Sequence, residues 1–406
     1  MKGPLEGCRV LDLSRVLAGP WCGQNLADLG AEVIKVERPG VGDDTRNWGP
    51  PFAKNAAGEP TRESAYFLST NRGKRSITLD IAVPEGQAIA RELAAKCDIL
   101  LENYKVGGLA KYGLDSATLS KVCPRLIYCS ITGFGQTGPY RERPGYDFLM
   151  QGMGGLMSIT GEPDDVPGGG PLKAGIAVTD LMTGQYATIA VLAALQARHS
   201  TGRGQHIDLA LFDVQVAYLS NQAMHYLVSD EVPPRIGNGH PSIVPYQTFR
   251  AKDGSIIVAT GNDGQYRKLC VALGLSGLAE DPRFLANADR VRNRTLLASL
   301  LGEAIVCRPM DHWIAVLEAA GVPCGPINTL DRVFADPQAK ARGLSFDLPH
   351  PSAGTVPTIA SPMRFSETPV EHERPPLLGE HTAQVLGELA GISDQQLQTL
   401  RARNIV

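Results

Sequence analysis

Residues 8–37, CRVLDLSRVLAGPWCGQNLADLGAEVIKVE, decide the fold of this chain. The first six residues, CRVLDL, are rich in strand-forming side chains, and AEVIKVE at 31–37 is a second run of the same kind. Between them, the apolar residues from Cys22 to Leu29 recur at helical spacing. A strand, a helix and a second strand in this order open a parallel α/β domain.

The same alternation continues along the N-terminal half. Strands are predicted at 76–81, 98–103 and 125–131, and a helix at 85–97. Successive βα units of this kind predict a Rossmann-like parallel sheet. Glu37 ends the second strand, where an acid could hold the ribose of a dinucleotide. Pro20 and Trp21 replace the glycines that let a backbone approach pyrophosphate, so the sequence argues against NAD binding.

The middle of the chain has a different pattern. Residues 150–175 are rich in glycine and proline, as in a loop. A hairpin is predicted within 246–261, turning at Asp253-Gly254. Helices are predicted at 181–199, 211–228, 264–273, 290–306 and 310–320. We therefore expect a large domain at 1–225, a smaller α+β domain at 226–325, and a C-terminal segment at 326–406 that returns to the large domain.

Composition limits the class of protein. The 406 residues, 43% hydrophobic and 20% charged, carry a net charge of -3, which is typical of a soluble globular protein and not of a nucleic-acid binder. The N-terminus lacks a signal-peptide core, and the apolar run at 187–197 is too short to span a membrane. Eight scattered cysteines without metal-ligand spacing predict reduced thiols and no metal site. We expect a cytoplasmic protein with no nucleic-acid or membrane partner.

One acid stands out for chemistry. Asp180 lies among small and apolar residues in LKAGIAVTDLMTG, residues 172–184, ahead of a long apolar helix. A carboxylate there would lose solvation and become a better nucleophile or base. Asp is also a preferred N-cap residue, so Asp180 could simply cap a helix beginning at Leu181. Local spacing leaves both interpretations open.

Eight segments, in order along nearly the whole chain, carry a resemblance: LSRVLAGP, GAEVIKVERPG with GDDTR, NRGKRSITLD, LLENYKVGGLAKYG, VTDLMTG, TGRGQHIDLAL, GVPCGP and PLLGEHT. Together they resemble the class III CoA-transferases, the family of formyl-CoA transferase, carnitine CoA-transferase and, as a side branch, α-methylacyl-CoA racemase. The resemblance implies a Rossmann-like large domain, a small domain and an interlocked homodimer. It also implies acyl-CoA and carboxylic acids as substrates, with no permanently bound cofactor.

The resemblance also assigns residues, each by its position in a matching segment. Asp180 falls on the catalytic aspartate, which would form an acyl anhydride and then an aspartyl-CoA thioester. Arg38 matches the contact to the adenosine phosphate, and Lys111 stands where the family usually has an arginine. The other positions that line the CoA site correspond to Val16, Leu79, Asn103, Tyr104 and Tyr146.

Further residues are candidates for contacts to the substrates or for support of the site. Gly237, Gly239 and His240 belong to a loop that the family places over the acyl group, although His240 could simply fix its own loop. Arg15 could anchor a substrate carboxylate, and Asp147 could support the site by hydrogen bonds or face solvent. Lys74 and Arg75 are either further CoA contacts or a solvated basic turn.

Substrate and reaction type are narrowed by three features. Leu17 stands where formyl-CoA transferase has a glutamine, which argues against oxalate and formate. The loop GNGHPSIVPY resembles the branch that acts on dicarboxylates such as succinyl-CoA with glutarate, and also the carnitine branch. The alternatives are an α-methylacyl-CoA racemase-type isomerase and a non-catalytic acyl-CoA-binding protein. Tyr146 and Asp147, where the racemase has its second base, argue against the racemase because a neutral tyrosine with a pKa of about 10 is a poor proton shuttle.

Overall fold

The structure is a computed structural model that describes residues 3–406. The chain forms two compact units. Of the described residues, the first unit contains 3–156, 174–224 and 337–406, and the second contains 157–173 and 225–336. Compared with the domains expected from the sequence, the second unit also includes the loop at 157–173 and extends to residue 336. Two helices, α6 (Leu156–Ile159) and α9 (Ser220–Ser229), cross a boundary between the units in the sequence.

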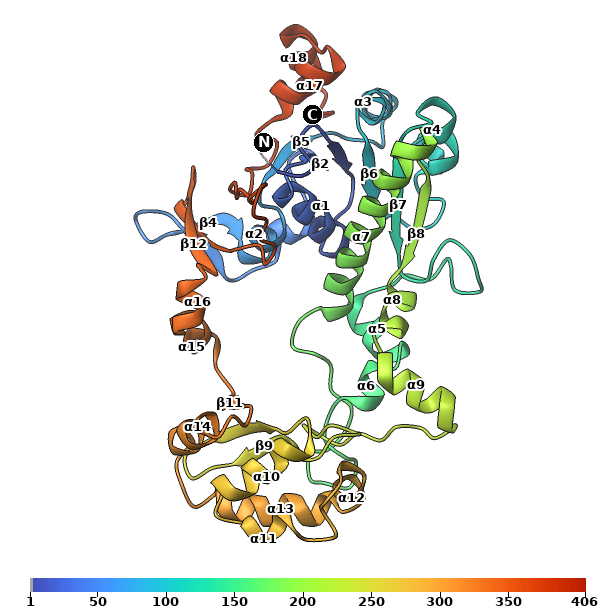
Figure 1. Ribbon diagram of the computed structural model, residues 1–406. Coiled ribbons are helices and arrows are strands. Elements are labelled where there is room, and N and C mark those ends of the chain that lie inside the picture. The colour runs from blue at the N-terminus through green and yellow to red at the C-terminus, as the bar shows by residue number, and fades with distance from the viewer. Residues whose placement is uncertain (1–2) are drawn as a thin grey trace. The chain divides into compact units, whose positions relative to one another are not determined.

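A six-stranded sheet is the centre of the first unit (Figure 1). Its strands lie in the order β5-β2-β1-β6-β7-β8, and every neighbouring pair is parallel. Their bounds are β1 Arg9–Asp12, β2 Glu32–Glu37, β5 Lys74–Thr78, β6 Ile99–Glu102, β7 Ile127–Thr132 and β8 His206–Ala210. The predicted α/β fold with a parallel sheet is confirmed.

Helices cover both faces of this sheet, as the unbroken apolar runs of its strands require. Val10 of β1 packs toward α1 and α7, in a core with Cys22 and Val191. Leu11, the next residue, packs in the opposite core with Leu93 of α3 and other helix residues. The helices of this unit are α1 Ala18–Asp28, α2 Ala65–Thr70, α3 Pro84–Ala95, α4 Ser116–Val122, α5 Asp147–Met153, α7 Val178–Thr201, α8 Leu211–Ala217, α16 Pro337–Ala341, α17 Thr382–Ala390 and α18 Asp394–Ala402.

The first unit also carries short elements outside the sheet. The 3-10 helices are η1 Asp44–Asn47 and η2 Ala110–Tyr112, and two hairpins are formed by β3 Phe52–Lys54 with β4 Pro60–Ser64 and by β12 Ser345–His350 with β13 Gly354–Ile359.

The second unit is a small α+β structure. Its antiparallel sheet has the order β11-β10-β9, and the hairpin predicted at Asp253-Gly254 is confirmed by the pairing of β9 with β10. Its elements are β9 Tyr246–Arg250, β10 Ser255–Ala259, β11 Cys324–Pro326, α10 Asp263–Ala272, α11 Ser276–Ala279, α12 Asn287–Arg292, α13 Arg294–Ile305, α14 Met310–Ala319 and α15 Leu330–Ala335. Its separate core includes Phe249, Leu301 and Leu317.

Helix α7 corrects one expectation from the sequence. The apolar run at 187–197 belongs to a helix of 24 residues, which is long and apolar enough to cross a membrane. The run by itself is too short, as predicted, but the prediction overlooked that the helix containing it continues beyond the run at both ends. Ala187 and Val191 of α7 pack in the sheet core, and a core helix of a soluble protein passes the same test of length and composition.

Candidate active site

The strand order leaves a crevice at one end of the sheet. The chain runs outward from β1 through β2 to β5, then crosses back to β6 on the other side of β1. Loops that leave neighbouring strands in opposite directions open a crevice beyond their carboxyl ends, where open α/β sheets bind ligands. Here these loops are residues 13–17 after β1 and 103–109 after β6, and both belong to the first unit.

A cavity of about 680 Å³ lies at this crevice. It brings together seven residues predicted from the sequence, which come from five separate stretches of chain: Arg15, Val16, Asn103, Tyr104, Lys111, Tyr146 and Asp180. Leu17 also lines it, with its side chain almost fully buried. Tyr146 is 70% exposed and therefore lies where the cavity meets solvent.

A second cavity of about 520 Å³ contains two more predicted residues, Arg38 and Leu79. Arg15, Tyr104 and Tyr112 line both cavities, so the two share a wall. A long ligand with a charged end and a reactive end could therefore extend from one cavity into the other.

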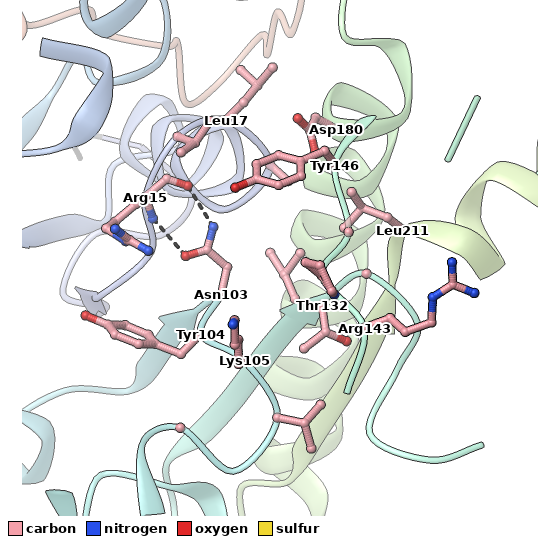
Figure 2. Close-up of a pocket in the computed structure, with 18 of the residues that line it drawn as sticks. Arg15, Leu17, Asn103, Tyr104, Lys105, Thr132, Arg143, Tyr146, Asp180 and Leu211 are labelled. Atoms are coloured by element: carbon pink, nitrogen blue, oxygen red, sulfur yellow. Dashed lines mark hydrogen bonds between the residues drawn. The ribbon is translucent and has the colours of Figure 1, made fainter. Parts of the chain in front are cut away.

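Asn103 joins the two loops of the crevice (Figure 2). Its side-chain oxygen accepts a hydrogen bond from the Arg15 backbone N–H at 2.9 Å, and its side-chain nitrogen donates to the Arg15 carbonyl at 2.7 Å. The Arg15 guanidinium lies 5.7 Å from the centre of the Tyr104 ring and 3.0 Å from Asp44. This ion pair is nearly half exposed, so it contributes little to stability and a ligand carboxylate could replace Asp44.

Asp180 reaches the cavity from the first turn of α7. One turn further, Gly184 lets α7 approach α1 closely, since a Cβ at this position would lie 2.5 Å from the Ala18 carbonyl oxygen. Ala18 directly follows the loop that contains Arg15 and Leu17. The close contact between the helices therefore brings the Asp180 turn to the same cavity as this loop.

The N-cap interpretation of Asp180 is wrong. The helix begins at Val178 rather than Leu181, and its N-cap position is Ala177, whose side chain cannot accept a hydrogen bond. Asp147, the first residue of α5, takes over this task from outside the helix: one carboxylate oxygen accepts the Thr179 N–H at 2.8 Å and the Asp180 N–H at 3.4 Å. Its other oxygen accepts a hydrogen bond from Gln151 at 2.7 Å.

These surroundings change the acidity of Asp180. Burial and, secondarily, the negative charge of Asp147 raise the pKa of Asp180 to about 7. Within residues 3–406, no side chain donates a hydrogen bond to its carboxylate, so nothing there offsets the loss of water. A poorly solvated carboxylate that ionises near neutral pH is suited to nucleophilic attack.

Three basic or acidic residues of the neighbouring strands have other tasks. Lys74 is fully buried and lies 2.9 Å from Asp12, so it is neither in a solvated basic turn nor free to bind CoA. Arg75 pairs with Glu32 and Glu388 and lines neither of the two cavities. Glu37 accepts two hydrogen bonds of 2.7 Å from Arg46, which is consistent with the argument against a dinucleotide.

The candidate loop at 237–240 lies in the second unit, where it is held by local contacts. Gly237 has a φ of 59° and donates its N–H to Gly161 at 3.1 Å. The His240 ring accepts a hydrogen bond from the Ser242 N–H at 3.1 Å and lies 5.3 Å from the Tyr246 ring. Gly239 donates its N–H to Ile236 at 3.2 Å. These contacts fix the loop itself, and an acyl-binding role for its residues stays a prediction.

Some cavity residues were not predicted from the sequence. Lys105 directly follows two predicted residues, and its charge next to Asn103-Tyr104 could have identified it. Trp48 and Arg143 also line the larger cavity, and Arg143 lies 4.5 Å from the centre of the Tyr140 ring. They belong to irregular loops, whose course around a cavity has no periodic signal in the sequence. In the part of the chain that the structure describes, no group of three or more His, Cys, Asp or Glu side chains could hold a metal ion.

Comparison with known proteins agrees with this geometry. Residues 5–382 match CoA-transferase family III. A succinate–glutarate CoA-transferase of Agrobacterium fabrum is 52% identical over 96% of this chain and 97% of its own length. The human succinyl-CoA:glutarate CoA-transferase is 45% identical over 99% of this chain and 90% of its own. The crystal structure of a CAIB/BAIF family protein from Brucella suis covers 96% of this chain and all of its own, with 52% identity and a TM-score of 0.84. The chain therefore belongs to CoA-transferase family III and is a CoA-transferase.

Proposed function

We propose that this enzyme transfers CoA from succinyl-CoA to a small dicarboxylate such as glutarate, with Asp180 as the nucleophile. The observation that carries the proposal is the half-buried Asp180 carboxylate with its raised pKa, in a cavity bordered by the residues expected to bind CoA. The donor and acceptor follow from the names of the two relatives, which cover nearly the whole chain.

The first half of the reaction releases succinate. An Asp180 oxygen attacks the thioester carbonyl, the carbon–sulfur bond breaks, and a mixed anhydride and the CoA thiolate form. The thiolate then attacks the aspartyl carbonyl of the anhydride, so that succinate leaves and an aspartyl-CoA thioester remains. Each step exchanges one anion for another, and no net proton is taken up or released.

The second half runs the same steps in reverse order. A carboxylate oxygen of the acceptor attacks the aspartyl thioester and expels the CoA thiolate, which forms a new anhydride. The thiolate attacks the acceptor's carbonyl in this anhydride, which produces glutaryl-CoA and restores the Asp180 carboxylate. The chemistry needs no metal or redox cofactor, and CoA enters and leaves as a substrate.

Binding is divided between the two cavities. Arg38 and Leu79 hold the adenosine phosphate end, and Val16, Asn103, Tyr104, Lys111 and Tyr146 line the path to Asp180. Lys111 keeps the positive charge of the arginine usual in the family but cannot form a bidentate contact. Asp147 positions the first turn of α7 by its hydrogen bonds.

Arg15 gives the site its preference for a diacid. Arg15 lines both cavities, and its guanidinium forms a nearly half-exposed pair with Asp44, so the far carboxylate of the acceptor can take the place of Asp44. Arg15→Met should raise KM for glutarate about tenfold or more while leaving KM for a monocarboxylate within about twofold. Equal effects on both acceptors, or activity only with a monocarboxylate such as carnitine, would remove the dicarboxylate assignment.

Trapping the intermediate tests the nucleophile. The enzyme is incubated with succinyl-CoA, treated with hydroxylamine, digested and examined by mass spectrometry. A hydroxamate on Asp180 supports the transferase, and Asp180→Asn serves as the control that cannot form it. Exchange of an α-deuterium of an acyl-CoA without any adduct would support the racemase instead. Tight CoA binding with neither adduct nor exchange would indicate a non-catalytic binding protein.

The enzyme is further proposed to act as an interlocked homodimer in the cytoplasm, without nucleic-acid or membrane partners. Exposed apolar side chains on one side of α7 and α8, including Ile189 and Tyr218, support the dimer.

A further inference from the structure

Val16 has an unusual backbone conformation at the wall of the larger cavity. Its φ is 72°, in the left-handed region that favours glycine and asparagine. Valine is branched at Cβ, so this conformation is strained and persists only where the surroundings enforce it. The residue lines the cavity that also contains Asp180, which raises the question of what holds it there.

The two consecutive peptide groups that precede Val16, between Ser14 and Arg15 and between Arg15 and Val16, have fixed partners on all four polar atoms. The Ser14 carbonyl accepts a hydrogen bond from the Lys35 ammonium at 3.0 Å. The Asn103 side chain binds both the backbone N–H and the carbonyl of Arg15. The Val16 N–H donates to the two carboxylate oxygens of Asp43, at 3.4 and 3.3 Å. The turn is thus fixed from three directions by groups outside it.

Lys35 and Asp43 also bind each other. Their side chains are 2.8 Å apart, and neither has any exposed surface. Burial alone would raise the pKa of Asp43, but Lys35 and the hydrogen bonds from Thr45 outweigh it and hold the pKa at about 2. A buried ion pair stabilises a fold no better than apolar side chains of the same volume, so stability alone does not explain this pair.

The turn that contains Asp43 is itself held firmly. It has the sequence GDDTR, residues 42–46, and the Asp43 N–H donates to Glu37 at 2.9 Å. Gly42 has a φ of 74°, and a Cβ there would lie 2.6 Å from the Arg46 side chain. Asp43 lines the second cavity and Asp44 the larger one, so this turn lies between the two cavities.

We propose that Asp43, together with Lys35, is a positioning residue that holds Val16 in its strained conformation and so shapes the cavity wall on which the CoA thioester lies. Asp43 acts through Val16 and does not itself touch the reacting atoms. The inference rests on the proposed function only in naming CoA as the ligand of this cavity.

Replacing both charges tests the inference without leaving one of them buried and unpaired. Lys35→Met with Asp43→Leu removes the pair and the acceptor of the Val16 N–H, while both new side chains suit a buried site. We expect this double variant to fold and to bind free CoA about tenfold more weakly in calorimetry. The matched control is Arg72→Met with Asp28→Leu, which removes another buried ion pair, one that lines neither cavity, and should leave CoA affinity unchanged.

A second measurement reports the strain without any ligand. Val16→Gly should raise Tm in the otherwise unchanged protein because glycine adopts this φ freely. In the Lys35→Met, Asp43→Leu background the gain should vanish, since Val16 has already relaxed. An equal rise of Tm in both backgrounds, or an unchanged CoA affinity of the folded double variant, overturns the inference. If only the proposed transfer chemistry is wrong, the wild-type enzyme forms no Asp180 adduct. The weaker CoA binding of the double variant and the background-dependent Tm gain of Val16→Gly are then still observed.

Discussion

A carboxylate that attacks a thioester must be ionised and yet poorly solvated, and these two requirements oppose each other. Asp180 reaches a balance between them, since burial and the nearby Asp147 charge raise its pKa only to about 7. Asp147 contributes in two ways, because it caps α7 through the Thr179 N–H and also places a like charge near the proposed nucleophile.

The pH dependence of the reaction should follow this acidity. Because the attacking form is deprotonated, kcat/KM should rise about tenfold per pH unit below pH 7 and level off above it. Asp147→Asn removes the like charge and should move the midpoint to lower pH. A midpoint that stays in place in this variant would show that Asp147 acts only through its hydrogen bonds.

A control variant identifies the titrating group. Burial also raises the pKa of Glu102 to about 7, and this side chain lies at the end of β6, next to Asn103. Glu102→Gln should leave the midpoint of the pH profile unchanged, whatever it does to kcat. A midpoint that disappears in Glu102→Gln would assign the titration to Glu102 rather than Asp180.

Asp180 should also reduce stability at high pH. Its pKa is raised on folding, so the stability it contributes is complete below the unfolded value of 3.8 and is lost as the pH rises through about 7. The full pKa shift corresponds to a loss of about 4 kcal/mol in the free energy of unfolding. Because water remains around a half-buried side chain, we expect a loss of about 1–2 kcal/mol. Asp180→Asn, which we expect to be inactive in transfer, should therefore unfold at a higher urea concentration than the wild-type protein at pH 8. The difference should shrink as the pH falls and vanish only near pH 4, and an advantage that is the same at pH 8 and pH 4 would contradict the raised pKa.

At the scale of the elements, the contact of α7 with α1 sets the place of Asp180. Alanine at a helical glycine normally stabilises by about 1 kcal/mol, but overpacking a tight contact costs about 1–3 kcal/mol. Gly184→Ala places a Cβ 2.5 Å from the Ala18 carbonyl oxygen, so we expect lower stability in urea unfolding and a lower kcat. Gly302→Ala in α13 is the matched control, because a Cβ there meets no atom within 4 Å. If both variants behave alike in stability and turnover, the two helices do not constrain the site.

Apolar periodicity predicted the strands of the sheet well and the breaks within helices poorly. All four strands predicted between residues 31 and 131 lie in the parallel sheet. The single helix predicted at 211–228 is wrong, since α8 ends at Ala217 and α9 begins at Ser220, whose φ is 47°. The helix predicted at 290–306 is likewise divided at Asn293. A break of one or two residues barely changes an apolar pattern, so the sequence does not reveal it.

The candidate site shows a similar division. Asn103 was predicted from the resemblance to the class III CoA-transferases and Arg15 as a possible carboxylate anchor, and both follow strand ends, where parallel strands gather their carboxyl ends at one edge. The contacts that hold such residues in place could not be predicted. Lys35 lies in the middle of a strand and pairs with Asp43 across a loop, and nothing in the local sequence of either residue indicates the other. Asp147 and Asp180 meet only because two helices start at the same place.

At the scale of the whole molecule, apolar side chains on one side of α7 and at the end of α8 stay partly exposed in the structure of residues 3–406. Tyr186, Ile189, Leu192, Val216 and Tyr218 are between 36% and 53% exposed, and the rings of Tyr186 and Tyr218 lie 5.6 Å apart. Contiguous exposed apolar side chains of this kind mark an interface. A second copy of the chain is the expected partner, so folding and association should be linked and Tm should rise with protein concentration.

Placing a charge on this surface tests the dimer. Ile189→Glu would bury an unpaired carboxylate if the surface is an interface, so we expect dissociation in sedimentation equilibrium and a Tm several degrees lower. Val122→Glu on α4 is the matched control, because Val122 is 71% exposed and its substitution should change neither property. Activity should fall together with the dimer fraction in Ile189→Glu if folding of the site depends on the proposed association. Two results would assign this apolar side of α7 to another partner. The wild-type protein could sediment as a monomer at every concentration, or Ile189→Glu could be as dimeric and as stable as Val122→Glu.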